Sequence, residues 1–136
     1  MCLYGVKRIL MPSAAIRYKV ALRDGDGYKS LHFPHGGLQP SAGIGCGWAM
    51  PEMCNYAFVW SDEPTYLWYA CGVHCFVERE DAEFVAGYEY GDAVLLKVEC
   101  RGPIVSGWEI YNNRSIFVDV WAEARVVEEL DIPRPW

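Results

Sequence analysis

The chain has 136 residues, of which 52% are hydrophobic and 15% aromatic, and this is enough apolar material for one domain with a sizeable core. That composition argues against a disordered chain. The formal net charge is -6 at pH 7 and the basic residues are scattered singly, which argues against a direct nucleic-acid binder, because phosphate contacts need a basic face.

Targeting signals and cysteines bear on the compartment. No run approaches the ~20 apolar residues of a membrane span, and residues 1–15 lack the long apolar stretch of a signal peptide. We therefore expect a cytoplasmic protein without a membrane partner. In a reducing compartment the six cysteines are expected to be free thiols rather than disulfides.

The N-terminal part predicts an arm followed by a hairpin. Residues 1–15 show no hydrophobic period and contain Pro12, so we expect a loosely attached arm. The segment 16–23, IRYKVALR, alternates apolar residues with mostly basic ones and predicts a half-buried strand. The sequence DGDG, residues 24–27, tolerates positive φ, and the extended YKSLHF follows it. The two segments therefore predict a hairpin.

The segment 34–51, PHGGLQPSAGIGCGWAMP, is rich in glycine and proline and predicts a long loop that is functional or mobile. Its Gly-x-Gly-x-Gly run has no Walker lysine and no strand-turn-helix context, so a phosphate-binding loop is not expected. An aromatic stretch, 55–77, comes next. Within it, Ser61 or Asp62 is suited to cap a short helix with Pro64 in its first turn.

Two cysteines and a histidine crowd into YACGVHC, residues 69–75. A structural zinc site needs four converging ligands, usually from close pairs such as Cys-x2-Cys. Here Cys71 and Cys75 have three residues between them, so we expect no metal. We expect instead a strand over 71–77, with Cys75 facing the core and His74 facing a second packed layer or a cleft.

The C-terminal half predicts one helix and several strands. Residues 78–86 have the spacing of a short amphipathic helix, and 92–102 is the strongest strand of the chain. Two or three further extended segments follow, with a turn at Asn112 and Asn113, and 131–136 form a proline-stiffened tail. Together the elements predict a single α+β domain over 1–136, a mostly antiparallel twisted sheet with one or two short helices.

The segment CGVHCFVEREDAEFV resembles the Gly-Ile-His-Ala-Phe-type segment and short helix of small proteins of bacteria and their phages. In those proteins a strand of the VLLKVECRG type and a late RAE-type segment follow, which 121–123 resemble here. The resemblance covers about residues 16–130 and implies a protein encoded by a phage or mobile element, which would act in the host cytoplasm if a phage encodes it.

More remotely, the same segment is similar to the Gly-Ile-Tyr-Phe-Ala stretch and helix of ADP-ribosyltransferases, which form a wall of the nicotinamide pocket. This second resemblance implies an ADP-ribosyltransferase-like fold. It also implies catalytic places at Arg17, Phe84 and Glu123, with NAD as the cofactor.

Besides a structural or assembly protein, which would form a stable oligomer, two functions remain open. The first is a small acidic binding protein without a cofactor, which engages a host protein, for example by inhibiting a bacterial defence nuclease, or a nucleotide-like ligand. Aromatic side chains suit such a site because each buries a large area at little entropic cost, and we expect it to include His74, Phe84, Trp48, Trp60 and Trp68. The second is an enzyme, a mono-ADP-ribosyltransferase or a related nucleotide-using protein.

Overall fold

The computed structural model describes residues 5–7, 10–24, 27–30, 56–61, 66–70, 72–88 and 92–133. Eight strands and one helix lie in these ranges: β1 (Gly5–Lys7), β2 (Ala14–Asp24), β3 (Gly27–Ser30), β4 (Tyr56–Ser61), β5 (Tyr66–Ala70), β6 (Val73–Phe76), α1 (Arg79–Tyr88), β7 (Ala93–Tyr111) and β8 (Arg114–Leu130). The strands form one sheet in the order β3-β2-β6-β8-β7-β1-β4-β5. Among the described strands only β1 and β4 pair in parallel, so the predicted α+β fold with a mostly antiparallel sheet is confirmed.

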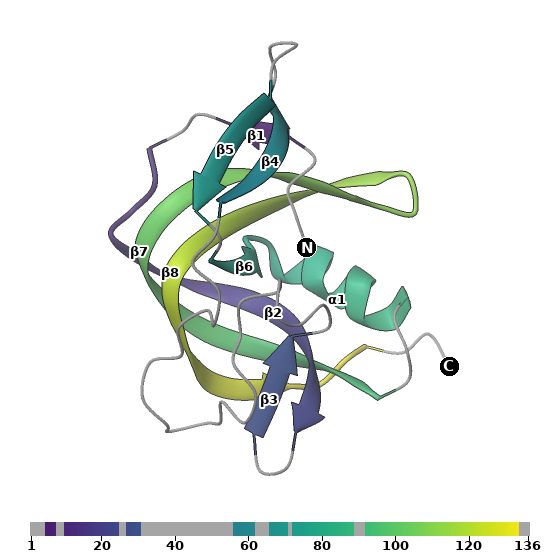
Figure 1. Cartoon of the computed structure of the whole chain (residues 1–136). Helices are drawn as coiled ribbons and strands as arrows, with labels where there is room; N and C mark the ends of the chain where they lie inside the picture. The colour runs from purple at the N-terminus through teal and green to yellow at the C-terminus, as the bar shows by residue number, and fades with distance from the viewer. Residues whose placement is uncertain are drawn as a thin grey trace.

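The long strands β7 and β8 shape the molecule. They pair with each other along their whole length and run side by side as an arch, with β6 and α1 between its two arms (Figure 1). β2 pairs with the first half of β7 and, through Tyr18 and Phe76, with β6. Since β6 pairs in turn with β8, strands β2, β6, β8 and β7 form a closed ring.

The bend of the arch lies at Gly102 and Pro103. Gly102 has φ +70, and a Cβ atom added there would lie 2.8 Å from the Cβ of Ala122. The register of β7 against β8 shifts between Pro103 and Val105. A β-bulge of this kind bends a strand and accepts proline, which has no N–H to donate to the ladder. The segments expected on either side of residue 102 are therefore one continuous strand.

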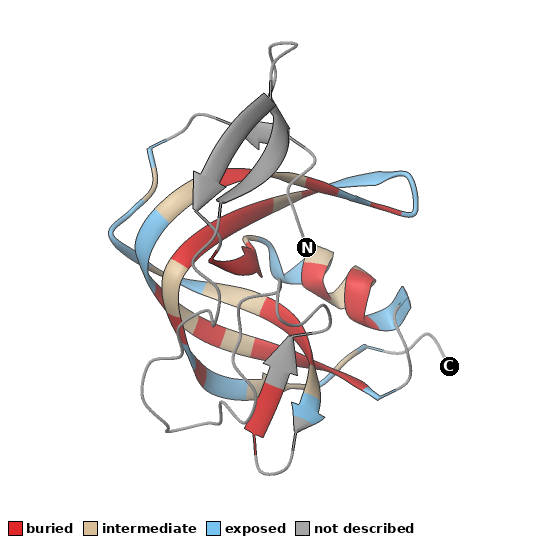
Figure 2. Cartoon of the chain, viewed as in Figure 1, coloured by how far each residue is buried: buried red, intermediate tan, exposed pale blue. Residues whose placement is uncertain are grey.

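The sheet carries an apolar cluster on each face. Neighbouring residues alternate between the two clusters, as Leu95 and Leu96 do on β7 and Cys75 and Phe76 do on β6. The first cluster packs α1 through Ala82, Val85 and Ala86. Buried positions run along β6 and the inner side of α1, whereas the tip of the β7–β8 hairpin is exposed (Figure 2). The described elements thus share one core divided by the sheet.

The local predictions hold for most of the described elements. The strand expected over 16–23, its hairpin with β3 and the helix expected over 78–86 are all present. Asn112 and Asn113 have φ 48 and 63, as a two-residue hairpin turn requires. No helix in the described part of the chain is long and apolar enough to cross a membrane.

Other predictions differ from the structure or concern residues that lie outside the described ones. The segment 1–15, expected as a loose arm, contributes β1, which pairs with β4 and β7, and the first residues of β2. A three-residue strand is too short to show a hydrophobic period. Ser61, considered as a helix cap, ends β4, and 62–65 lie outside the described residues. The loop 34–51 and residues 134–136 of the tail also lie outside them, while 131–133 have no regular structure.

Candidate functional site

The three tryptophans expected at a binding surface are only partly placed. Trp48 lies outside the described residues. The backbone of Trp60 lies on β4 beside Gly5 of β1, and that of Trp68 lies on β5 opposite Phe58. The structure describes only the backbone of these two residues, so their role in a binding site stays a prediction.

His74 faces away from Cys75, as expected, and of the two surroundings expected for it the described residues provide a packed layer. Its side chain is buried, and Nδ1 lies 3.0 Å from the carbonyl oxygen of Gly72. Burial, with a smaller contribution from the charge of Lys19, lowers the pKa of His74 to about 3. The imidazole is therefore neutral at pH 7 and its Nδ1–H donates to Gly72, which makes His74 a structural residue rather than an exposed contact.

Phe84 lies at the surface in an ordered aromatic group. Its ring stacks on that of Tyr88, one turn further along α1, with centroids 6.3 Å apart and an interplanar angle of 13°. The guanidinium of Arg114, at the start of β8, lies over the Phe84 ring with Cζ 4.6 Å from the centroid. Arg114 also donates to Asp81 over 2.8 Å. We call Asp81, Phe84, Tyr88 and Arg114 the α1 surface.

The α1 surface combines exposure with negative surroundings. Tyr88 is 60% exposed, and Phe84 is partly buried against the first apolar cluster. Glu78 and Glu80 are exposed at the start of α1, and Glu83 pairs with Arg79 over 2.9 Å. The arrangement is a stacked aromatic pair with one arginine on top and carboxylates alongside.

Each of the three residues implied by the transferase resemblance has its own partners. Arg17 binds Asp119 over 2.7 Å and lies with Cζ 5.7 Å from the Trp121 ring. Glu123 accepts two hydrogen bonds from Arg101, over 2.7 and 3.0 Å. Phe84 is held by Tyr88 and Arg114. None of these contacts joins one of the three residues to another.

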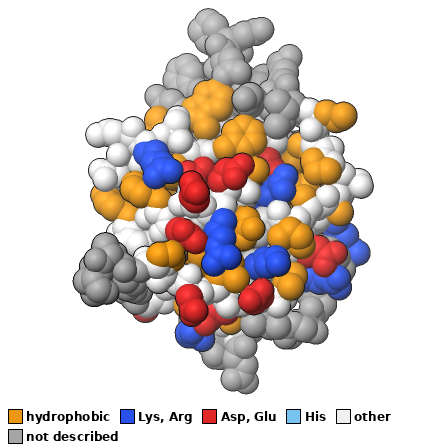
Figure 3. Space-filling model, turned by 180° about the vertical axis from the view of Figure 1, so that it is seen from behind, with side chains coloured by type: hydrophobic (Ala, Val, Ile, Leu, Met, Phe, Trp, Pro, Cys, Tyr) orange, Lys and Arg blue, Asp and Glu red, His pale blue; other side chains and the backbone are white. Residues whose placement is uncertain are grey.

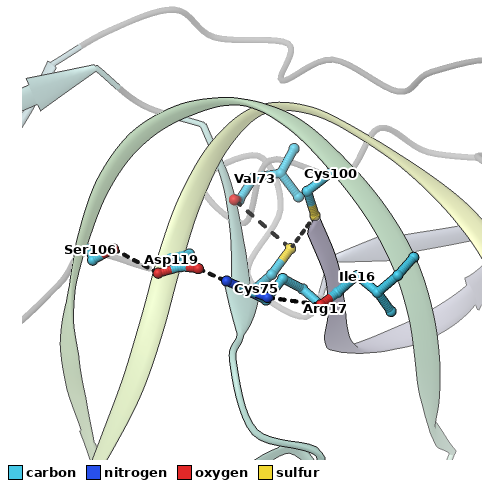
Figure 4. A network of polar contacts seen from close by, with 7 residues as sticks. All are labelled: Ile16, Arg17, Val73, Cys75, Cys100, Ser106 and Asp119. Atoms are coloured by element: carbon cyan, nitrogen blue, oxygen red, sulfur yellow. Dashed lines mark hydrogen bonds and ion pairs between the residues drawn. The ribbon is translucent and has the colours of Figure 1, made fainter. Parts of the chain in front are cut away.

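Beneath the arch lies a buried polar network that sequence reasoning missed. Asp119 is buried, and its two carboxylate oxygens accept from Arg17 and from Ser106, each over 2.7 Å (Figure 4). Lys19 is buried beside them and donates over 2.8 Å to the carbonyl oxygen of His74. The alternation in IRYKVALR assigned Arg17 and Lys19 to solvent, yet they share a face with buried Ala21.

Two thiols complete this network. Cys75 and Cys100 are free and buried, with their Sγ atoms 3.6 Å apart. Burial alone would raise the pKa of Cys75, but the hydrogen bond with Cys100 and the charges of Lys19 and Arg17 lower it overall, although Asp119 opposes them. The same hydrogen bond, together with burial, raises the pKa of Cys100. Either thiol can donate in this contact, and Cys75 Sγ also lies 4.0 Å from the carbonyl oxygen of Val73, to which it can donate.

Glu109 is a second buried acid, on β7 opposite Ile116. Burial raises its pKa to about 7, although the charge of Lys19 and a hydrogen bond from Tyr111 act in the other direction. Its Oε1 has no hydrogen-bond partner among the described residues. The carboxyl group therefore changes its protonation state near neutral pH.

Acidic and basic side chains lie beside one another on the face of the molecule shown in Figure 3. At the surface of β2, β7 and β8, the ion pairs are Arg23–Glu129, Arg101–Glu123 and Arg125–Glu99. Paired charges of this kind do not make the basic face that nucleic acid requires. The described residues hold no group of three metal-ligating side chains. Comparison of the chain with family models, curated proteins and solved structures found no match.

Proposed function

We propose that the chain is a protein-binding module that engages a basic surface of a partner protein through the α1 surface. The observation that carries this proposal is the Phe84–Tyr88 stack with Arg114 over it. Tyrosine, other aromatic residues and arginine are enriched among the residues that contribute most to protein association. Here they form one contiguous group.

The α1 surface is ordered before any partner arrives. Arg114 is fixed between the carboxylate of Asp81 and the ring of Phe84, and Tyr88 is stacked on that ring. A side chain already held in its bound orientation loses little entropy on association. The exposed Tyr88 ring is then the anchor that enters a pocket of the partner.

Charge favours a basic partner. The chain carries a net charge of -6, and Glu78, just before α1, and Glu80, in the first turn of α1, are both exposed. Opposite charges speed association and align the partners. The nucleic-acid-binding face of a nuclease has this character, so an inhibitor of such an enzyme is the form of the function that we favour. A nucleotide-like ligand fits less well, because its phosphates would meet these carboxylates.

Affinity capture from a bacterial lysate, followed by mass spectrometry, tests the proposal. The wild-type chain should retain a specific partner that Tyr88→Ala and Arg114→Ala lose. Val127→Ala, which truncates an exposed side chain on β8 outside the α1 surface, is the matched control and should retain it. Equal capture by all four proteins would show that the α1 surface is not the binding site.

The enzymatic alternative is tested separately. Incubation of the chain with labelled NAD and the same lysate should leave the lysate proteins unlabelled. Transfer of label to any of them would contradict a function by binding alone. It would also favour a catalytic role for Arg17 and Glu123, although Arg17 pairs with Asp119 and Glu123 pairs with Arg101 in the structure.

A further inference from the structure

Cys75 and Cys100 come from two strands that do not pair with each other. Cys75 lies on β6 and Cys100 on β7, and β2 pairs with both strands. Their side chains point toward each other in the second apolar cluster, beneath the arch (Figure 4). The Sγ atoms are 3.6 Å apart. A disulfide bond measures about 2.05 Å, so the two sulfurs need to approach by about 1.6 Å.

We propose that Cys75 and Cys100 are a reversible oxidation site, which a peroxide converts into an intramolecular disulfide. The site does not depend on the proposed binding function, because it lies in the core and shares no residue with the α1 surface. Two facts carry the proposal. The sulfur atoms are already in contact, and two basic side chains, Lys19 and Arg17, make their hydrogen bonds in the same region beneath the arch.

The basic side chains determine which sulfur reacts first. Arg17 and Lys19, the latter with a pKa that burial lowers, favour the thiolate of Cys75, which is the nucleophilic form. The Cys75 thiolate attacks one oxygen of hydrogen peroxide and the O–O bond breaks. The products are a sulfenic acid and hydroxide, which takes up a proton to become water.

Cys100 completes the reaction. Its sulfur attacks the sulfenic sulfur of Cys75, the S–S bond forms, and the S–O bond breaks. The Cys100 proton leaves with the departing hydroxide as a second water. Two thiols are thereby oxidised by two electrons in total, and one peroxide is reduced to two waters. Exogenous thiol reverses the reaction by exchange at the disulfide.

Burial limits which reagents reach the two cysteines. Cys75 is 1% exposed and Cys100 is 0% exposed, so a small oxidant reaches them by local opening and a bulky disulfide reagent reacts more slowly. Once formed, the bond ties β6 to β7 and encloses α1 in a covalent loop. Closing such a loop restricts the unfolded chain, so the oxidised protein should melt at a higher temperature than the reduced one.

The experiment isolates the pair in the full-length chain by replacing Cys2, Cys46, Cys54 and Cys71 with serine. After treatment with hydrogen peroxide, the intact mass should fall by two hydrogen atoms. Both thiols should become unreactive to a thiol reagent added under denaturing conditions, and dithiothreitol should restore them. Cys100→Ala in the same background is the matched control and should give no loss of two hydrogens. Circular dichroism verifies that each variant is folded.

Wild-type protein provides a second measurement if the serine background fails to fold. Its remaining thiols are blocked after oxidation, and digestion should yield linked peptides that contain Cys75 and Cys100. Two outcomes would overturn the proposal. One is persistence of both thiols in folded protein under conditions that oxidise the unfolded chain. The other is addition of oxygen to Cys75 while Cys100 stays a free thiol.

Discussion

Asp119 is a buried carboxylate whose two oxygens are both bonded, one to Arg17 and one to Ser106. Removing one partner of a buried ion pair leaves an uncompensated charge, at a cost of roughly 3–5 kcal/mol. We expect Arg17→Met to lower the free energy of unfolding by about 3 kcal/mol, since the Arg17 side chain is partly exposed. Urea denaturation measures this difference.

An exposed ion pair supplies the control for this prediction. Arg125 binds Glu99 over 2.6 Å, but both side chains are open to water, and exposed pairs contribute less than about 1 kcal/mol. Arg125→Met should therefore change the free energy of unfolding little. Adding Asp119→Asn to Arg17→Met should recover part of the loss, because the buried charge is gone. Equal effects of Arg17→Met and Arg125→Met would refute the buried-network account.

Glu109 makes stability depend on pH. Its pKa is raised from 4.5 to about 7 in the folded chain, so between these values the folded state binds more protons than the unfolded state. Stability therefore falls as pH rises from 4.5 to 7. Over that range, Glu109→Gln should gain roughly 3 kcal/mol relative to wild type. Urea titrations at a series of pH values measure the gain, and a constant difference would contradict it.

His74 gives the opposite slope. Its pKa is lowered from 6.5 to about 3 in the folded chain, so in that window the unfolded state binds more protons. The stability that depends on the neutral imidazole of His74 is fully present above pH 6.5 and is lost as pH falls toward 3. Between pH 4.5 and 6.5 the two residues act against each other. We expect His74→Gln to lose less stability than wild type below pH 4.5, as measured by urea titrations at a series of pH values. An equal loss in the variant and in wild type would contradict this.

The buried polar residues also mark what the sequence could not reveal. Strand alternation assigns residues to two faces but does not show that both faces are covered. Alternation therefore predicted that Lys19 and Arg17 face solvent, and it left a cleft open as the surroundings of His74, although the His74 side chain is buried and bonded to Gly72. Cys75 was correctly predicted in the core because its side chain is small and apolar, and such a side chain packs well on either buried face of a sheet.

At the scale of elements, two glycines predict opposite effects of the same substitution. Gly102 has φ +70 at the bend of β7, and an added Cβ would meet that of Ala122, so Gly102→Ala should cost about 2 kcal/mol. Gly87 lies in α1 with nothing near its Cβ position, so Gly87→Ala should stabilise by roughly 0.5–1 kcal/mol. Thermal melting of both variants measures the contrast. Destabilisation by Gly87→Ala would count against this account.

Local signals explain why some elements were predictable. α1 has apolar residues at helical spacing, and the Asn112–Asn113 turn has residues that accept positive φ. The continuous strand through Gly102 was not predictable from local signals, because glycine followed by proline usually ends a strand. Here a bulge keeps the strand continuous, and that depends on pairing with Ala122, which is distant in the sequence. Ring closure through Tyr18 and Phe76 depends likewise on contacts that no local pattern encodes.

At the scale of the whole molecule, the ring should make β2 open only when the domain unfolds. β2 pairs with β7 over nine consecutive residue pairs and closes onto β6, so its local separation would expose both apolar clusters. Amides of β2 that bond to β7 should therefore exchange with solvent deuterium at the free energy of global unfolding. β3 is a four-residue edge strand that pairs only with β2 among the described strands, and its amides should exchange faster. Native-state hydrogen exchange with increasing denaturant distinguishes the two classes. Exchange of β2 at a free energy well below that of β7 would mean that the ring opens on its own.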